Sequence, residues 1–152
     1  MHETDKLVLN YFKKFSSFES ALRISSKAGL DKSANIIWDH VKRSLKNRHF
    51  TLTDEQKVLE IIQNPPLQLK FKSDSKELSW NLGEISTQDS DLVINVLVRV
   101  RNNLFHGSKK FGDSSESDRN INLIAGALII LDSVIKSLDI DDVYNDIVDY
   151  WN

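Results

Sequence analysis

The sequence predicts an all-α protein, a single bundle of five to six helices over residues 1–152, with an irregular strap at about 64–88. Apolar residues recur at helical spacing through most of the chain. The 152 residues include only five glycines and two prolines, so long helices can run without interruption. Neither an internal repeat nor a shift in composition marks a boundary between domains, and 40% hydrophobic residues can build one core.

The first third of the chain predicts two amphipathic helices. Residues 4–25 carry an apolar stripe at steps of three to five residues, formed by Leu7, Phe12, Phe15, Phe18 and Leu22. Asp31 is then expected to cap a second helix over 32–48. The apolar stripe of that helix is formed by Ile37, Val41 and Leu45.

The middle of the chain is less regular. Thr53 and Gln56 have the spacing of a capping box, which predicts a third helix ending near Gln63, before the two prolines. After it, Leu67, Leu69 and Phe71 alternate with polar residues, which fits either a short strand or an extended strap over the helices.

The most apolar helix is predicted to open at Asp89 and to end at Gly107, a residue suited to the position after a helix. Its buried stripe is expected to comprise Leu92, Val93, Val96, Leu97, Val100 and Leu104, widened by Ile94 and Val98. Such a helix belongs at the centre of the bundle. Beyond a polar loop, the pattern predicts a long helix over about 118–138 and a short one after a cap at Asp139.

Composition and charge exclude several classes of function. The chain has no cysteine, which rules out a disulfide framework, cysteine-ligated zinc and a cysteine nucleophile. No apolar run is long enough for a membrane span, and the first residues do not form a signal peptide, so a cytoplasmic protein is expected. Net charge is −2, yet residues 1–50 hold ten Lys and Arg against five Asp and Glu, a balance that can attract phosphate.

The residues best suited to catalysis or phosphate binding lie at the end of the apolar helix, in the string RNNLFHG. Asn102 and His106 are four residues apart and share a helix face, and Arg101 adjoins them. Arginine offers a fork of donors for phosphate oxygens, and histidine can act as acid or base near neutral pH. Further contacts to a phosphate-bearing substrate are expected from Arg99, Asn103, Lys109 and Lys110.

This string resembles the hallmark of the HEPN superfamily of helical domains, an arginine followed after four to six residues by a histidine. Asn102 stands where that family often has a polar residue, and the form is similar to that of HEPN proteins in bacterial and plasmid-borne defence systems. The resemblance implies an endoribonuclease that needs no metal or other cofactor, with Arg101, Asn102 and His106 as catalytic residues. It also implies a homodimer with a composite active site, RNA as substrate, a toxin or antiphage role, and a regulatory or antitoxin partner.

Other interpretations of the same residues stay open. Arg43 and His49 also satisfy the spacing, and an arginine and a histidine at a helix end can simply cap carbonyl groups and favour the helix dipole. The chain could be a non-catalytic HEPN module that binds RNA or a nucleotide, or pairs with a nucleotidyltransferase. It could also be a helical interaction protein. The aspartates near the C-terminus lack the pattern of a calcium loop, and we expect them to form a solvated face.

Overall fold

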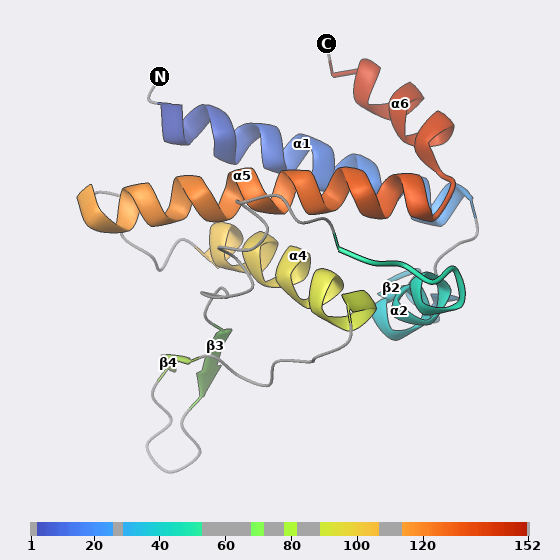
Figure 1. Cartoon of the computed structure of the whole chain (residues 1–152), viewed down its shortest axis with the longest axis horizontal. Coiled ribbons are helices and arrows are strands. Elements are labelled where there is room, and N and C mark those ends of the chain that lie inside the picture. Colours follow the sequence, from blue (N-terminus) through green and yellow to red (C-terminus); the bar gives the residue numbers. More distant parts are fainter. Residues whose placement is uncertain are drawn as a thin grey trace.

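The chain folds as a helical bundle in the computed structural model, which describes residues 3–25, 29–52, 68–71, 78–81, 89–106 and 114–151. Within these residues, the helices are α1 (Glu3–Ile24), α2 (Trp38–Asn47), α4 (Asp89–His106), α5 (Ser114–Ser137) and α6 (Asp141–Asp149). The helices α1, α4 and α5 pack against one another, and α6 lies beside α1 (Figure 1). The all-α prediction is confirmed. The predicted helix at 53–63 lies outside the described residues.

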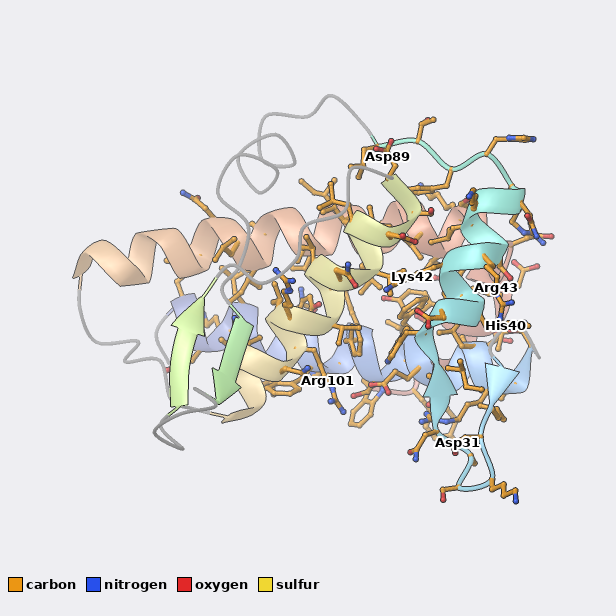
Figure 2. All side chains as sticks on the ribbon, turned by 90° about the horizontal axis from the view of Figure 1, so that it is seen from below. Asp31, His40, Lys42, Arg43, Asp89 and Arg101 are labelled. Carbon is orange, nitrogen blue, oxygen red and sulfur yellow. The ribbon has the colours of Figure 1, made fainter. Side chains whose placement is uncertain are left out.

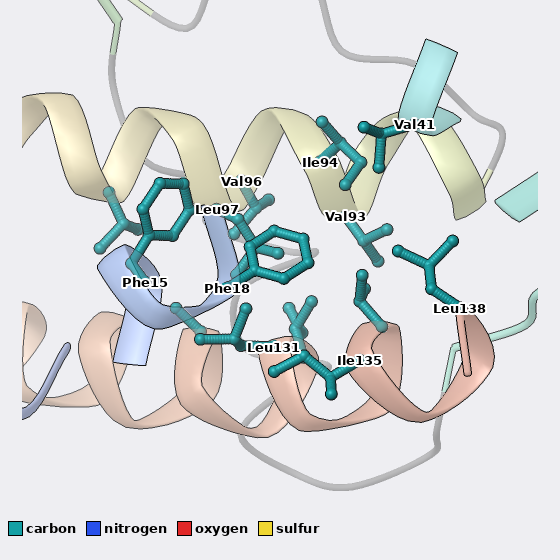
Figure 3. Close-up of a cluster of buried hydrophobic side chains, with 14 of the residues drawn as sticks. Phe15, Phe18, Val41, Val93, Ile94, Val96, Leu97, Leu131, Ile135 and Leu138 are labelled. Carbon is teal, nitrogen blue, oxygen red and sulfur yellow. The ribbon is translucent and has the colours of Figure 1, made fainter. Parts of the chain in front are cut away.

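The core forms where α1, α4 and α5 meet, because each of these helices turns an apolar stripe toward the other two. Phe15 and Phe18 of α1 are buried between α4 and α5 (Figure 3), and Trp38 at the start of α2 stacks against Phe18 with ring centroids 6.2 Å apart. Most of the stripe predicted for α4 is confirmed, since the following residues are at most 9% exposed: Leu92, Val93, Ile94, Val96, Leu97 and Val100. The other two predicted members, Val98 and Leu104, are only partly buried and pack against this core.

A hydrogen bond inside this core joins α1 to α4. The hydroxyl of Tyr11, which is fully buried, donates to the backbone carbonyl oxygen of Leu97 at 2.7 Å. Burial raises the pKa of this hydroxyl well above its ordinary value, so it stays protonated and can donate. The bond fixes the register of α1 against the turn of α4 that precedes Arg101.

The segment between α1 and α2 differs from the prediction. It forms a two-stranded antiparallel ribbon, β1 (Gly29–Leu30) and β2 (Ile36–Ile37), and α2 begins at Trp38 rather than after Asp31. The Asp31 carboxylate accepts hydrogen bonds from the backbone N–H groups of Ser33 and Asn35, so it closes the turn of the ribbon. The N-cap prediction was wrong because the same aspartate chemistry serves turns as well as helix caps.

Within the predicted strap, the structure forms an antiparallel pair, β3 (Gln68–Phe71) and β4 (Leu78–Asn81), and β3 contacts α4. The short strand that the alternating pattern allowed is therefore present over Gln68–Phe71. One further boundary differs from the prediction. Asp139 does not cap α6: it has a positive φ of 57°, and Ile140 occupies the N-cap position. None of the described helices is long and apolar enough to cross a membrane.

Candidate functional site

The site predicted at the end of α4 is partly described. Arg101 and Asn102 are in contact, since the Arg101 guanidinium donates from Nη1 to Oδ1 of Asn102 at 3.1 Å. The backbone of α4 continues as a helix to His106, four residues after Asn102, so the Cα atoms of these two residues lie on one face. The side chain of His106 lies outside the described residues, as do Lys109 and Lys110.

Arg101 faces a carboxylate that sequence reasoning missed. Its Nε lies 3.9 Å from Oε1 of Glu19 on α1, and the other oxygen of that carboxylate, Oε2, lies 3.9 Å from Nη2 of Arg23. Among the described residues, two guanidinium groups therefore flank this carboxylate. A guanidinium group carries five N–H donors, so it can pair with a carboxylate and also contact a phosphate oxygen.

Glu19 is an unusual residue for its position. Its side chain is only 18% exposed, and burial raises the pKa of its carboxyl, while Arg101 and then Arg23 lower it. A sequence signal existed, because Glu19 follows Phe15 by four residues and precedes Leu22 by three, on the stripe that α1 buries. A carboxylate on such a stripe needs a cationic partner.

Arg23 is held at the other side of Glu19 by the ribbon between α1 and α2. Its Nε donates to the backbone carbonyl oxygen of Ala34 at 3.2 Å. Ala34 has a positive φ of 61°, a conformation that the Asp31 turn supports through the hydrogen bond from Asn35 next to it. The unpredicted ribbon thus helps to position the ion pair beside Arg101.

The two other predicted contacts on α4 are placed differently. Arg99 and Arg101 are two residues apart and so point about 200° apart around the helix, which sets Arg99 away from the Glu19 side. Burial lowers the pKa of Arg99. Asn103 is only 8% exposed and lies with the core residues. The structure therefore brings Arg101 and Asn102 together, with Arg99 on another side of α4.

The second Arg-to-His spacing lies elsewhere in the molecule. Arg43 projects from α2, and Figure 2 shows it with His40 and Lys42, well apart from Arg101. His49 follows the end of α2 with a positive φ of 56°. The hollow beside Arg43 mixes charges, because Asp39 and Asp91 line it together with Lys42 and Lys46. Among the described residues, the arrangement around Arg101, where one carboxylate lies between two arginines of α1 and α4, is not repeated at Arg43.

The described residues also bear on metal binding. Among them, no three His, Asp or Glu side chains gather closely enough to hold an ion.

Comparison with models of protein families, with curated proteins and with solved structures finds no match to this chain. The resemblance to the HEPN superfamily therefore stays a prediction that rests on the residues around Arg101.

Proposed function

We propose that the chain is a HEPN-type endoribonuclease that cleaves RNA without a metal ion. One observation carries the proposal: the side chains of Arg101 and Asn102 contact each other on the central helix, one turn before His106. The Arg101 side chain is 38% exposed, so solvent, and hence a phosphate group, reaches it. Apolar packing of α4 holds this pair on a rigid element.

The proposed reaction uses the 2′-hydroxyl of the ribose as nucleophile. This oxygen attacks the adjacent phosphorus while the bond from phosphorus to the 5′-oxygen of the next nucleotide breaks. One His106 takes the proton from the 2′-hydroxyl, and a second His106, from the partner in a homodimer, gives a proton to the leaving 5′-oxygen. Arg101 stabilises the charge on the phosphorane, and Asn102 orients the phosphate or the histidine. The products are a 2′,3′-cyclic phosphate and a 5′-hydroxyl.

The biological setting is proposed on the same resemblance. A ribonuclease of this type suits a toxin or an antiphage effector in the cytoplasm, held inactive by a regulatory or antitoxin partner. RNA is its substrate, and no cofactor is required for the reaction described above.

A second candidate function has one observation in its favour. Glu19 lies 3.9 Å from Arg101 and offsets part of its charge. An arginine whose main role is to join α1 to α4 would serve a non-catalytic HEPN module that binds RNA, or that pairs with a nucleotidyltransferase. In that case Arg101 would contribute to stability and not to turnover.

The test is cleavage of a panel of labelled RNAs by the purified protein in EDTA. We expect wild type to cut, Arg101→Ala to lose about a hundredfold or more in rate, and His106→Ala to lose all detectable cutting. Arg43→Ala is the matched control and should cut like wild type, since Arg43 belongs to the other Arg-to-His spacing. Equal behaviour of wild type and His106→Ala on every RNA would reject the nuclease and leave the non-catalytic module.

A further inference from the structure

A basic hollow between α1 and α6 lies outside the site at Arg101. It has a volume of about 260 Å³ and is lined by Lys6, Leu9, Asn10, Lys13, Lys14, Val148 and Trp151. Five of these residues belong to α1. Leu9, Asn10, Lys13 and Lys14 follow Lys6 by three, four, seven and eight positions, so all five lie on one face of the helix. The described lining contains three ammonium groups and no carboxylate.

The hollow combines this charge with exposed apolar surface. The side chain of Trp151 is 55% exposed and that of Leu9 is 47% exposed. Trp151 is held in place, because its backbone N–H donates to the carbonyl oxygen of Val148 at 3.0 Å and Val148 packs against the core. A large aromatic ring is therefore presented to solvent at the rim of a cationic hollow.

These features together fit one class of ligand. Sites for single-stranded nucleic acid combine cationic groups that follow the phosphates with an aromatic ring on which a base stacks. The hollow is smaller than the roughly 300–1,000 Å³ of a site for a drug-sized molecule, so it suits one nucleotide of a strand that continues beyond it. The hollow beside Arg43 lacks the aromatic ring and carries two aspartates, which repel phosphate.

We propose that the α1–α6 hollow binds one nucleotide of single-stranded RNA, with the base stacked on Trp151 and its phosphates near Lys13 and Lys14. The inference rests on the proposed function for the choice of RNA as ligand, and it deepens that function by giving the substrate a second point of attachment. Lysine ammonium groups and a stacking ring do not read bases by hydrogen bonds, so this attachment is tolerant of sequence.

The test is fluorescence anisotropy with a labelled single-stranded RNA of about twelve nucleotides, long enough to reach across such a site. It uses the His106→Ala protein, which binds without cutting. Trp151→Leu is expected to weaken binding by roughly fivefold or more, whereas Trp151→Phe, which keeps a stacking ring, should stay within about twofold. The Lys13→Gln, Lys14→Gln double variant should lower the slope of log K against log salt by about 1.4.

Lys32→Gln serves as the matched control, because Lys32 is exposed in the turn between β1 and β2, at the other end of α1. It should bind like the parent protein. Equal affinity of Trp151→Leu and Trp151→Phe would overturn the inference, and so would equal binding of duplex and single-stranded RNA. A dimer that Trp151→Leu dissociates, with RNA binding unchanged, would show that a second copy covers the hollow and would also overturn it.

The two proposals fail separately in this design. Binding that needs Trp151, in a protein whose wild type cuts no RNA, would reject the nuclease and keep the hollow. Cleavage that needs His106, with binding indifferent to Trp151 and the lysines, would reject the hollow and keep the nuclease.

Discussion

At the scale of single residues, Glu19 connects the fold to the proposed chemistry. Its carboxylate lies between Arg101 and Arg23 on a stripe that α1 otherwise buries with phenylalanine and leucine. Burial disfavours the charged form of Glu19, and the two guanidinium groups only partly offset this. A partly buried carboxylate of this kind lowers the stability of the fold, but it holds the Arg101 guanidinium in one orientation.

Glu19→Gln is therefore expected to change how stability depends on pH. The carboxyl pKa is raised in the folded protein, so the folded state binds this proton more tightly than the unfolded chain does. The free energy of unfolding then falls as pH rises from the ordinary value of 4.5 through the raised pKa, and it stays lower above that window. Glutamine does not titrate, so the variant should lack this fall, which we expect to be about 1 kcal/mol or less for a partly solvated group.

Urea unfolding between about pH 4 and pH 7 measures the effect. Glu3→Gln, at an exposed position in the first turn of α1, is the control and should follow wild type. A Glu19→Gln curve parallel to wild type over this range would show that Glu19 has the same pKa in the folded and unfolded chain.

Two buried tyrosines offer a second prediction at this scale. Tyr11→Phe removes the 2.7 Å hydrogen bond to the Leu97 carbonyl and should lower the free energy of unfolding by about 1 kcal/mol. Among the described residues the buried hydroxyl of Tyr144 has no hydrogen-bond partner, so Tyr144→Phe should leave stability unchanged or raise it by about 1 kcal/mol. Thermal and urea unfolding of both variants check this. A larger loss for Tyr144→Phe than for Tyr11→Phe would contradict the hydrogen-bond assignment.

At the scale of elements, the apolar stripes decided what could be predicted. The periodicity of α1 and α4 predicted both helices within one residue of their observed ends. The helix cap predicted at Asp31 was wrong because an aspartate accepts the same hydrogen bonds in a turn as in a helix cap. Only the pairing of Gly29 with Ile37 selects the turn.

For the candidate site, the contact between Arg101 and Asn102 could be predicted because the two residues are neighbours on one helix. Glu19 is 82 positions away from Arg101 in the chain, and its approach depends on how α1 packs on α4.

The role of α4 as the central element leads to a prediction on packing. Leu97 is fully buried, so Leu97→Ala should lower the free energy of unfolding by about 2–5 kcal/mol through lost contacts and a cavity. Ile24→Ala is the control, because that side chain at the end of α1 is 66% exposed, and its loss should stay within about 0.5 kcal/mol. If urea unfolding gave the same loss of unfolding free energy for Leu97→Ala and Ile24→Ala, α4 would not be the core helix.

At the scale of the whole molecule, the proposed reaction needs an acid and a base, and each chain supplies one histidine to the string at Arg101. We therefore expect a homodimer with a mass near 35 kDa by light scattering, twice the 17.4 kDa of one chain. The rate of RNA cleavage per chain should fall on dilution below the dissociation constant of the dimer. A monomer that keeps its full rate per chain at every concentration would exclude the composite site.

In the reaction that we propose, the 2′-hydroxyl of RNA attacks the adjacent phosphate at a site built around Arg101 and His106. The most direct measurement compares, in EDTA, an RNA cut by the protein with the same RNA carrying a single 2′-deoxy nucleotide at the mapped cleavage position. We predict 2′,3′-cyclic phosphate ends from the first and no cut at the substituted position of the second, because that nucleotide lacks the nucleophile. Cleavage at the 2′-deoxy position, or products with 3′-hydroxyl and 5′-phosphate ends, would contradict this mechanism.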